Sequence, residues 1–301
     1  MCNLSIAYRV YFFFILLIFL ISVPSFGAVF EGKLVQREVR ISTFELPQSE
    51  GVNLEDSAEL EKFGNQLFSK SFEELKKLLP KDVPKETYDE SIFTIYIKGK
   101  KIRVDSQEKG EKMSYIIDMK NNILITIKWN EKVAMITSFE DLKETFSPMQ
   151  SQVQELMEKY KAQMETQIKK PQFSMKPTGE KKKILGIDCE LFTGTDSEGK
   201  FTHMWITRGE SDLFETFLNL SEAMSKMNFA EENVDDENEF IRQVKGVDLI
   251  TKRISPEVIV LEEILEIQRE KLSGNLFNIP PGFRKLNMKE MMQKQMEKFH
   301  K

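Results

Sequence analysis

Apolar and polar residues alternate along residues 176–207, and this pattern predicts two extended strands. One face of the first strand is apolar: Leu185, Ile187, Cys189 and Leu191. Residues 194–199 are rich in turn formers, so the two strands should form an antiparallel pair. The segment therefore predicts a strand pair that anchors a sheet, with Cys189 pointing into a core.

The same alternation between residues 91 and 137 predicts a β-meander, with Gly99 and Lys100 as a two-residue hairpin loop. One face of its fourth strand, from Ile123 to Trp129, is apolar and must lie on a core or a ligand. A core is the expected answer, although both stay open. The predicted strands of the meander are 92–98, 101–105, 113–119, 123–129 and 132–137. Further strands are expected at 28–45, 247–254 and 258–268, with residues 280–283 as a fixed edge.

Apolar residues three to five positions apart predict four helices. The first spans 54–79, with Gly64 as a weak point, and is expected to bury its apolar stripe on the sheet. The others span 149–168, 212–227 and 288–299. Methionines in the last helix suit either gap filling in a core or a surface that accepts varied apolar shapes.

Residues 1–27 have the features of a secretory signal peptide: Arg9, a 13-residue apolar run, and small residues ending at Gly27. The run is shorter than the roughly 20 residues of a membrane-spanning helix. An uncleaved anchor stays an alternative. Cys2 precedes the run, so it is not placed for lipid modification after cleavage. The sequence thus predicts export to a periplasm or to the outside of the cell.

Removal of this signal leaves 274 of the 301 residues, expected to form one domain at 28–286 with a helical insertion at 53–79. A C-terminal amphipathic helix at 287–301 would follow. Loss of Arg9 changes the net charge from −5 to −6, which argues against nucleic acid as a partner. Cys189 becomes the single cysteine, so no internal disulfide can form. A monomer with a buried Cys189 is expected.

The sequence offers no catalytic, cofactor or metal site, and its ligand-binding residues stay unknown. His203 and His300 are the only histidines, and no P-loop, G-x-G-x-x-G or G-x-S-x-G motif occurs. Glu262 and Glu263 are strand neighbours that should point to opposite faces. Six acidic residues within 231–239 lack the spacing of a calcium loop and predict a solvated loop.

Three motifs stand in order along the chain. Residues 96–103 read Y-I-K-G-K-K-I-R, residues 177–190 read P-T-G-E-K-K-K-I-L-G-I-D-C-E before M-W-I-T, and residues 277–283 read F-N-I-P-P-G-F. This set, over about residues 90–285, resembles a family of bacterial exported domains of uncharacterised function. The family is similar in fold to the periplasmic lipoprotein carriers, in which a curved antiparallel sheet wraps around helices and an apolar cavity. Departures are a longer helical insertion and the acidic segment after Phe229.

We therefore expect a mainly antiparallel α+β protein, a curved sheet or half-barrel wrapping helices. The first functional hypothesis is an exported binding protein that shelters a lipid, an acyl chain or another hydrophobic ligand on the concave face. The alternative is a non-enzymatic scaffold of the cell envelope with a filled core and a protein partner. A hydrolase with scattered carboxylates is the least favoured hypothesis.

Overall fold

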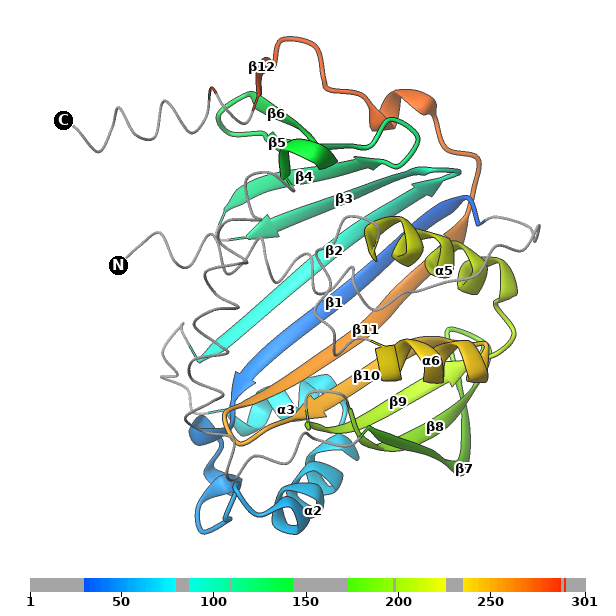
Figure 1. Cartoon of the computed structure of the whole chain (residues 1–301). Coiled ribbons are helices and arrows are strands. Elements are labelled where there is room, and N and C mark those ends of the chain that lie inside the picture. Colours follow the sequence, from blue (N-terminus) through cyan, green and yellow to red (C-terminus); the bar gives the residue numbers. More distant parts are fainter. Residues whose placement is uncertain are drawn as a thin grey trace, which may run out of the picture.

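The computed structural model describes residues 30–79, 87–108, 110–142, 173–196, 199–225, 235–287 and 290. Their strands form one open, curved and mostly antiparallel sheet of 12 strands, in the order β12-β6-β5-β4-β3-β2-β1-β11-β10-β9-β8-β7 (Figure 1). The predicted mainly antiparallel sheet with helices is thereby confirmed. The strands are β1 (Gly32–Ser42), β2 (Tyr88–Lys98), β3 (Lys101–Glu108), β4 (Glu111–Asp118), β5 (Ile123–Lys128), β6 (Val133–Ser138), β7 (Ser174–Ile184), β8 (Ile187–Thr195), β9 (Phe201–Thr207), β10 (Val247–Ile254), β11 (Val258–Arg269) and β12 (Arg284–Asn287).

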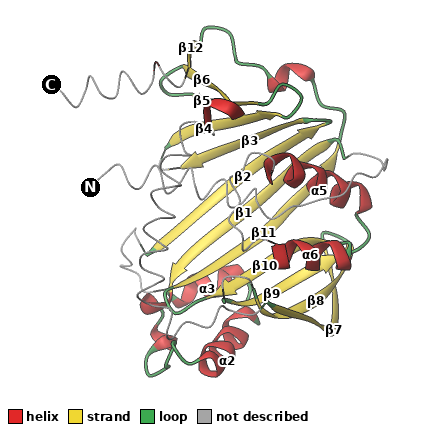
Figure 2. Cartoon of the chain, in the orientation of Figure 1, coloured by secondary structure: helices red, strands yellow, loops and turns green. Residues whose placement is uncertain are grey.

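Short helical segments connect and cover these strands (Figure 2). They are the 3-10 helices η1 (Thr43–Glu45), η2 (Pro47–Ser49) and η4 (Gly274–Phe277), and the α-helices α2 (Ser57–Phe68), α3 (Phe72–Leu78), α5 (Ser211–Ser225) and α6 (Asp235–Val244). Within the described ranges, none of these helices has the length and apolar character that crossing a membrane requires.

The two faces of the sheet carry different helices. Alternate residues of a strand point to opposite faces. In β1, Leu34 belongs to an apolar cluster shared with α5 and α6, whereas Val39 and Ile41 belong to a cluster shared with α2 and α3. We name these the α5 face and the α2 face. In Figure 1, α5 and α6 lie in front of the strands, and α2 and α3 lie at the lower edge.

On the α2 face, two segments of the chain cover different ends of the sheet. Helices α2 and α3 bury Phe63, Leu67 and Leu75 against β1, β9, β10 and β11. At the other end, the segment 272–283 buries Leu272 and Phe277 against β4, β5 and β6. The apolar face of β5 therefore lies on a core supplied by the chain itself, which answers the choice between core and ligand that the sequence left open.

The helix predicted over 54–79 is wrong in one respect, because the structure has two helices there. Helix α2 ends at Phe68, and α3 begins after Ser71, whose hydroxyl and backbone are joined to Glu74 in a capping box. Gly64 is not the weak point. It lies inside α2, where an added Cβ would stand 2.7 Å from Phe201 and 2.9 Å from Ile254, so the missing side chain allows close contact with the sheet.

Two further predictions need correction. The stretch 176–207, predicted to hold two strands, holds three, because residues 174–184 form the separate strand β7, and Leu185 does not point into the core but is 46% exposed in the turn before β8. The acidic stretch 231–239, predicted to be a loop, enters helix α6 at Asp235, and α6 ends on apolar residues, Ile241 among them, that pack against the sheet.

The other strands and α5 lie where the alternation predicted them, and β12 adds a short parallel edge strand beside β6. The predicted signal peptide 1–27, the helix 149–168 and the C-terminal helix 287–301 fall outside the described residues, apart from Asn287 and Glu290.

Candidate functional site

The α5 face of the sheet is a broad apolar surface. Residues from most strands of the sheet join one apolar cluster there, and α5 and α6 add Leu213, Phe214, Leu218 and Ile241. All of these side chains are less than one tenth exposed. The strand residues are Leu34, Phe93, Ile97, Ile102, Val104, Ile117, Leu124, Phe192, Met204, Ile206, Leu249 and Ile264.

Part of this surface stays accessible. Ile95 lies in the middle of β2, between the buried Phe93 and Ile97, and is only half-buried. Phe217 of α5 and Met119 after β4 are half-buried against the same cluster. Apolar side chains that keep contact with water near a large cluster can release further water when an apolar molecule covers them. The α5 face is therefore the candidate ligand surface of the described residues.

A buried patch of charged residues adjoins the apolar cluster on the same face. Glu38 is 4% exposed and Arg253 is 5% exposed. Arg40 Nε lies 2.7 Å from Glu38 Oε1, and Arg253 contacts both Glu262 and Asp196. Within the described residues no donor reaches Glu38 Oε2. Burial, and then the charge of Glu262 on the neighbouring strand, raise the pKa of Glu38 to about 7.

Glu38→Gln is expected to stabilise the protein at pH 8. The folded protein keeps the Glu38 proton up to its pKa of about 7, whereas the unfolded chain loses it near 4.5. The stability that Glu38 contributes is thus complete below pH 4.5 and is lost as the pH rises through 7. Urea unfolding should show a gain of roughly 1–3 kcal/mol at pH 8 and little change at pH 4.5. The exposed Glu257→Gln is the control. A gain that is equal at both pH values contradicts this assignment.

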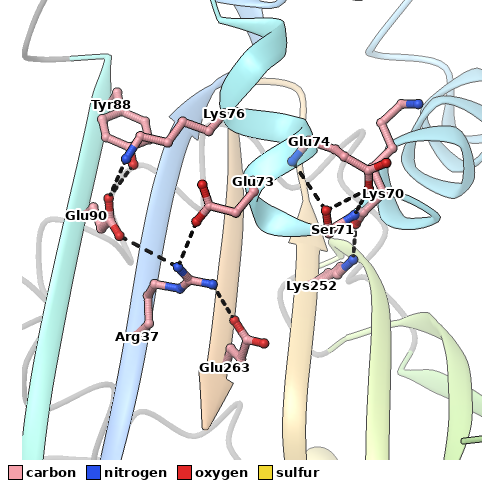
Figure 3. Close-up of polar contacts among 10 residues, drawn as sticks. All are labelled: Arg37, Lys70, Ser71, Glu73, Glu74, Lys76, Tyr88, Glu90, Lys252 and Glu263. Atoms are coloured by element: carbon pink, nitrogen blue, oxygen red, sulfur yellow. Dashed lines mark hydrogen bonds and ion pairs between the residues drawn. The ribbon is translucent and has the colours of Figure 1, made fainter. Parts of the chain in front are cut away.

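On the α2 face, a polar network fastens α3 to the sheet (Figure 3). The guanidinium of Arg37 lies 3.8 Å from the centre of the Phe72 ring. The same guanidinium lies 2.7 Å from Glu263, 3.4 Å from Glu73 and 3.9 Å from Glu90. One cation thus neutralises carboxylates from β2, β11 and α3, which makes this network a joint between layers and not a set of free acids.

Two more polar groups in Figure 3 serve the same joint. Lys252 Nζ donates to the carbonyl oxygens of Phe68 and Lys70, at 2.8 and 2.7 Å, and so caps the end of α2. Burial, and then the charge of Lys182, lower the pKa of Lys252 to about 8. Although the pKa of Lys252 is lowered, its amine is held by these two hydrogen bonds to backbone carbonyl oxygens. Tyr88 donates to Glu90 at 2.6 Å, and burial is the first cause that raises its pKa to about 12.

His203 lies at the contact between α2 and β9. Its ring lies 5.0 Å from that of Phe68 and 5.2 Å from that of Phe201, and Nε2 lies 3.0 Å from Asn65 Oδ1. Burial, and then the charge of Lys252, lower the pKa of His203 to about 4. His203 is therefore a hydrogen-bonded histidine of a helix joint.

The lowered pKa of His203 predicts a loss of stability in acid. Unfolded histidine binds a proton near pH 6.5, whereas the folded protein binds it only near 4. The stability that neutral His203 contributes is present above pH 6.5 and is lost as the pH falls toward 4. His203→Gln should remove about 1–2 kcal/mol of this acid sensitivity in urea unfolding between pH 7 and pH 4. Curves of unfolding free energy against pH that run parallel for the wild type and for His203→Gln would refute the effect. Protonation of Glu38 changes stability in the opposite direction in both proteins, so the quantity to compare is the difference between the two curves at each pH.

The residues singled out from the sequence do not meet in one site. Cys189 is 3% exposed, and burial raises the pKa of its thiol, as expected for a packed cysteine. Glu262 contacts Arg253 on one face and Glu263 contacts Arg37 on the other, as the strand alternation predicted. The described ranges hold no group of three or more histidine, cysteine, aspartate or glutamate side chains suited to a metal ion.

Sequence reasoning missed the two charged networks. Each depends on β1 lying beside β11, which brings Arg37 to Glu263 and Glu38 to Glu262 across more than 220 residues of chain. No local sequence motif predicts that these charged residues of β1 and β11 lie together. Only the capping box of Ser71 and Glu74 left a short-range signal in the sequence.

Residues 84–283 match the family described as "Domain of unknown function (DUF4412)". The chain belongs to the DUF4412 family. This match spans nearly the range of the resemblance stated from the motifs and confirms a family of uncharacterised function. No curated protein matches the chain.

Solved structures resemble this DUF4412 protein only distantly. An uncharacterised conserved protein from Thermus thermophilus has a TM-score of 0.35 at 9% identity, over 66% of this chain and 82% of that one. PNGF-II has a TM-score of 0.31 at 12% identity, over 87% of this chain and 33% of its own, so the chain spans about a third of PNGF-II. The similarity to lipoprotein carriers stays a prediction.

In this DUF4412 chain, the three sequence motifs have structural roles at two separate places. Arg103 of the first motif donates to the carbonyl oxygen of Leu276 at 2.8 Å, one residue before the third motif, 277–283. The motif 177–190 lies in β7 and β8, several strands away in the sheet. The first and third motifs therefore lie near each other, and the second lies at the other end of the sheet.

Proposed function

We propose that the protein is an exported, non-enzymatic binding protein that holds a lipid, an acyl chain or another hydrophobic ligand against the α5 face. The observation that carries this proposal is the apolar cluster of that face, whose rim keeps Ile95, Met119 and Phe217 half-buried. Removal of such surface from water favours binding by roughly 25 cal/mol per Å².

Two other features support this choice of surface. On the α2 face, the chain itself covers the apolar clusters, through α2, α3 and the segment 272–283. Arg40, which pairs with Glu38 and is about one third exposed, lies on the α5 face and would give an amphipathic ligand a polar group to meet. The similarity in fold to the lipoprotein carriers, inferred from the sequence motifs, agrees with such a ligand.

Ile95→Thr tests the proposal with a matched control on the same strand. Ile95 lies on the α5 face, and Ile92 lies on the α2 face, where it is 49% exposed. Both variants keep a β-branched residue in β2. If the ligand lies on the α5 face, Ile95→Thr should weaken the binding of a fluorescent fatty acid by about fivefold to tenfold, and Ile92→Thr should leave it unchanged.

Two results would exclude the ligand site. The purified protein could fail to bind any fluorescent fatty acid or lipid analogue, or Ile92→Thr could weaken binding as much as Ile95→Thr. Thermal unfolding of both variants, measured beside the titrations, separates loss of binding from loss of the fold.

A scaffold role in the cell envelope is the second candidate, and one observation favours it. Phe44 in η1 is 71% exposed beside the α2 and α3 unit. The apolar stripe of α2 is already buried on the sheet, so a partner would have to meet this outer surface. Phe44→Ser should then abolish a specific cross-link to an envelope protein without lowering stability. Retention of every cross-link by Phe44→Ser would argue against this role.

A further inference from the structure

The turn of the β7–β8 hairpin carries an apolar residue, Leu185, at a position with a positive φ and with contact to solvent. Ile184 pairs with Ile187, so Leu185 and Gly186 form the turn, with φ values of 51° and 80°. Turns with two positive φ values favour asparagine or aspartate before glycine. Of the four non-glycine residues with positive φ in the described part of the chain, Leu185 alone is apolar.

Leu185 is also exposed, at 46% of its surface. A side chain of this kind adds nothing to the core and strains the turn. Its positive φ at the tip therefore favours a role outside the fold, because strained backbone positions cluster at functional sites.

Basic residues surround Leu185. Lys181, Lys182 and Lys183 precede it, against one acid, Asp188, within residues 181–188, whereas the whole chain carries a net charge of −5. Lys183 Nζ lies 2.8 Å from Asp188, with side chains 65% and 85% exposed, so this ion pair stays in water. Lysines on an edge strand also discourage unwanted strand pairing, but that role does not require an apolar tip.

We propose that this hairpin tip docks on the surface of an anionic lipid bilayer. Leu185 would enter the interface while the lysines meet acidic head groups, the combination by which basic, partly apolar segments lie on membranes. β7 is the last strand of the sheet, at the opposite end from β12, so one side of this hairpin has no further strand of the described sheet beside it (Figure 1). This surface goes beyond the proposed ligand site and does not depend on it.

Vesicle flotation of the purified protein tests the proposal. Binding is expected to vesicles of mixed phosphatidylglycerol and phosphatidylcholine, to weaken with salt, and to be absent with phosphatidylcholine alone. Each lysine near an anionic surface contributes about a fivefold change, so K181Q/K183Q should lower binding by roughly 10- to 30-fold. The matched control K100Q/K120Q removes two exposed lysines from other hairpin turns and should leave binding unchanged.

Leu185→Asn separates a membrane site from a simple anion site. Asparagine suits the turn, so thermal stability should not fall, while vesicle binding should weaken by about fivefold. The proposal is overturned if mixed vesicles do not bind, or if K100Q/K120Q acts like K181Q/K183Q. It is also overturned if Leu185→Asn has no effect while the lysine pair governs binding to heparin as strongly as to vesicles. Failure of fatty-acid binding alone would instead concern the α5 face.

Discussion

Phe277→Ala is expected to lower the free energy of unfolding by about 3–5 kcal/mol. Phe277 is 2% exposed and lies with Ile116 and Ile127 in the cluster that joins the segment 272–283 to the sheet. Removal of its ring leaves a cavity between the segment and β4 to β6. The cavity cannot close easily, because the segment is held by contacts on the N-terminal side of Phe277.

These contacts are polar. Arg103 donates to the carbonyl oxygen of Leu276 at 2.8 Å, and Lys98 donates to that of Leu272 at 2.6 Å. Urea unfolding of Phe277→Ala beside Asn275→Ala measures the effect, since Asn275 is an exposed neighbour that should change stability by less than about 0.5 kcal/mol. A loss below about 1 kcal/mol for Phe277→Ala would show that the segment does not cover a core.

Leu67→Ala should cost about 2–5 kcal/mol. Leu67 is fully buried between α2 and the sheet, in the cluster that also holds Phe63 and Leu75. Gly64 lets this helix approach Phe201 so closely that the surrounding atoms have little freedom to fill the space that Leu67 would leave. The whole α2 and α3 unit should therefore loosen.

Leu185→Ala makes the same chemical change at an exposed position. Its effect on the free energy of urea unfolding should stay within about 0.5 kcal/mol. Equal losses for Leu67→Ala and Leu185→Ala would mean that α2 does not bury its apolar stripe on the sheet. That outcome would leave the apolar stripe of α2 free to meet a membrane or a partner protein.

The regular alternation of the meander made β2 to β6 predictable from the sequence, because each strand has one buried and one more polar face. Strand β7 lacks this signal. It lies at the sheet edge with nearly all side chains exposed, so neither face selects apolar residues. The exposed Leu185 was then misread as the start of the next strand's apolar face.

The helices show where periodicity is ambiguous. An apolar stripe runs through both α2 and α3, and the break between them is marked only by the capping box of Ser71 and Glu74. In α6, the acidic start resembles a solvated loop, yet negative charge also stabilises the first turn of a helix. The apolar residues Phe240, Ile241 and Val244 decide for the helix.

The candidate site could be predicted only in part. An apolar strand face was foreseen, but its cover depends on segments far away in the chain, and alternation carries no information about them. On the apolar face of β5, residues 272–283 help to bury Ile125 and Ile127, whereas Ile95 on the other face of the sheet keeps part of its surface exposed. Which apolar strand face is covered and which stays partly exposed depends on contacts between segments that are distant in the sequence.

The central claim is that the α5 face holds a hydrophobic ligand. Native mass spectrometry tests it most directly, on residues 28–301 purified from their own cell envelope without harsh detergent. If the α5 face holds such a ligand, the protein should carry a heterogeneous extra mass that organic extraction removes and that Ile95→Thr reduces more than Ile92→Thr. A bare protein mass, unchanged after incubation with lipid extract, would contradict it and would favour a filled core with a protein partner.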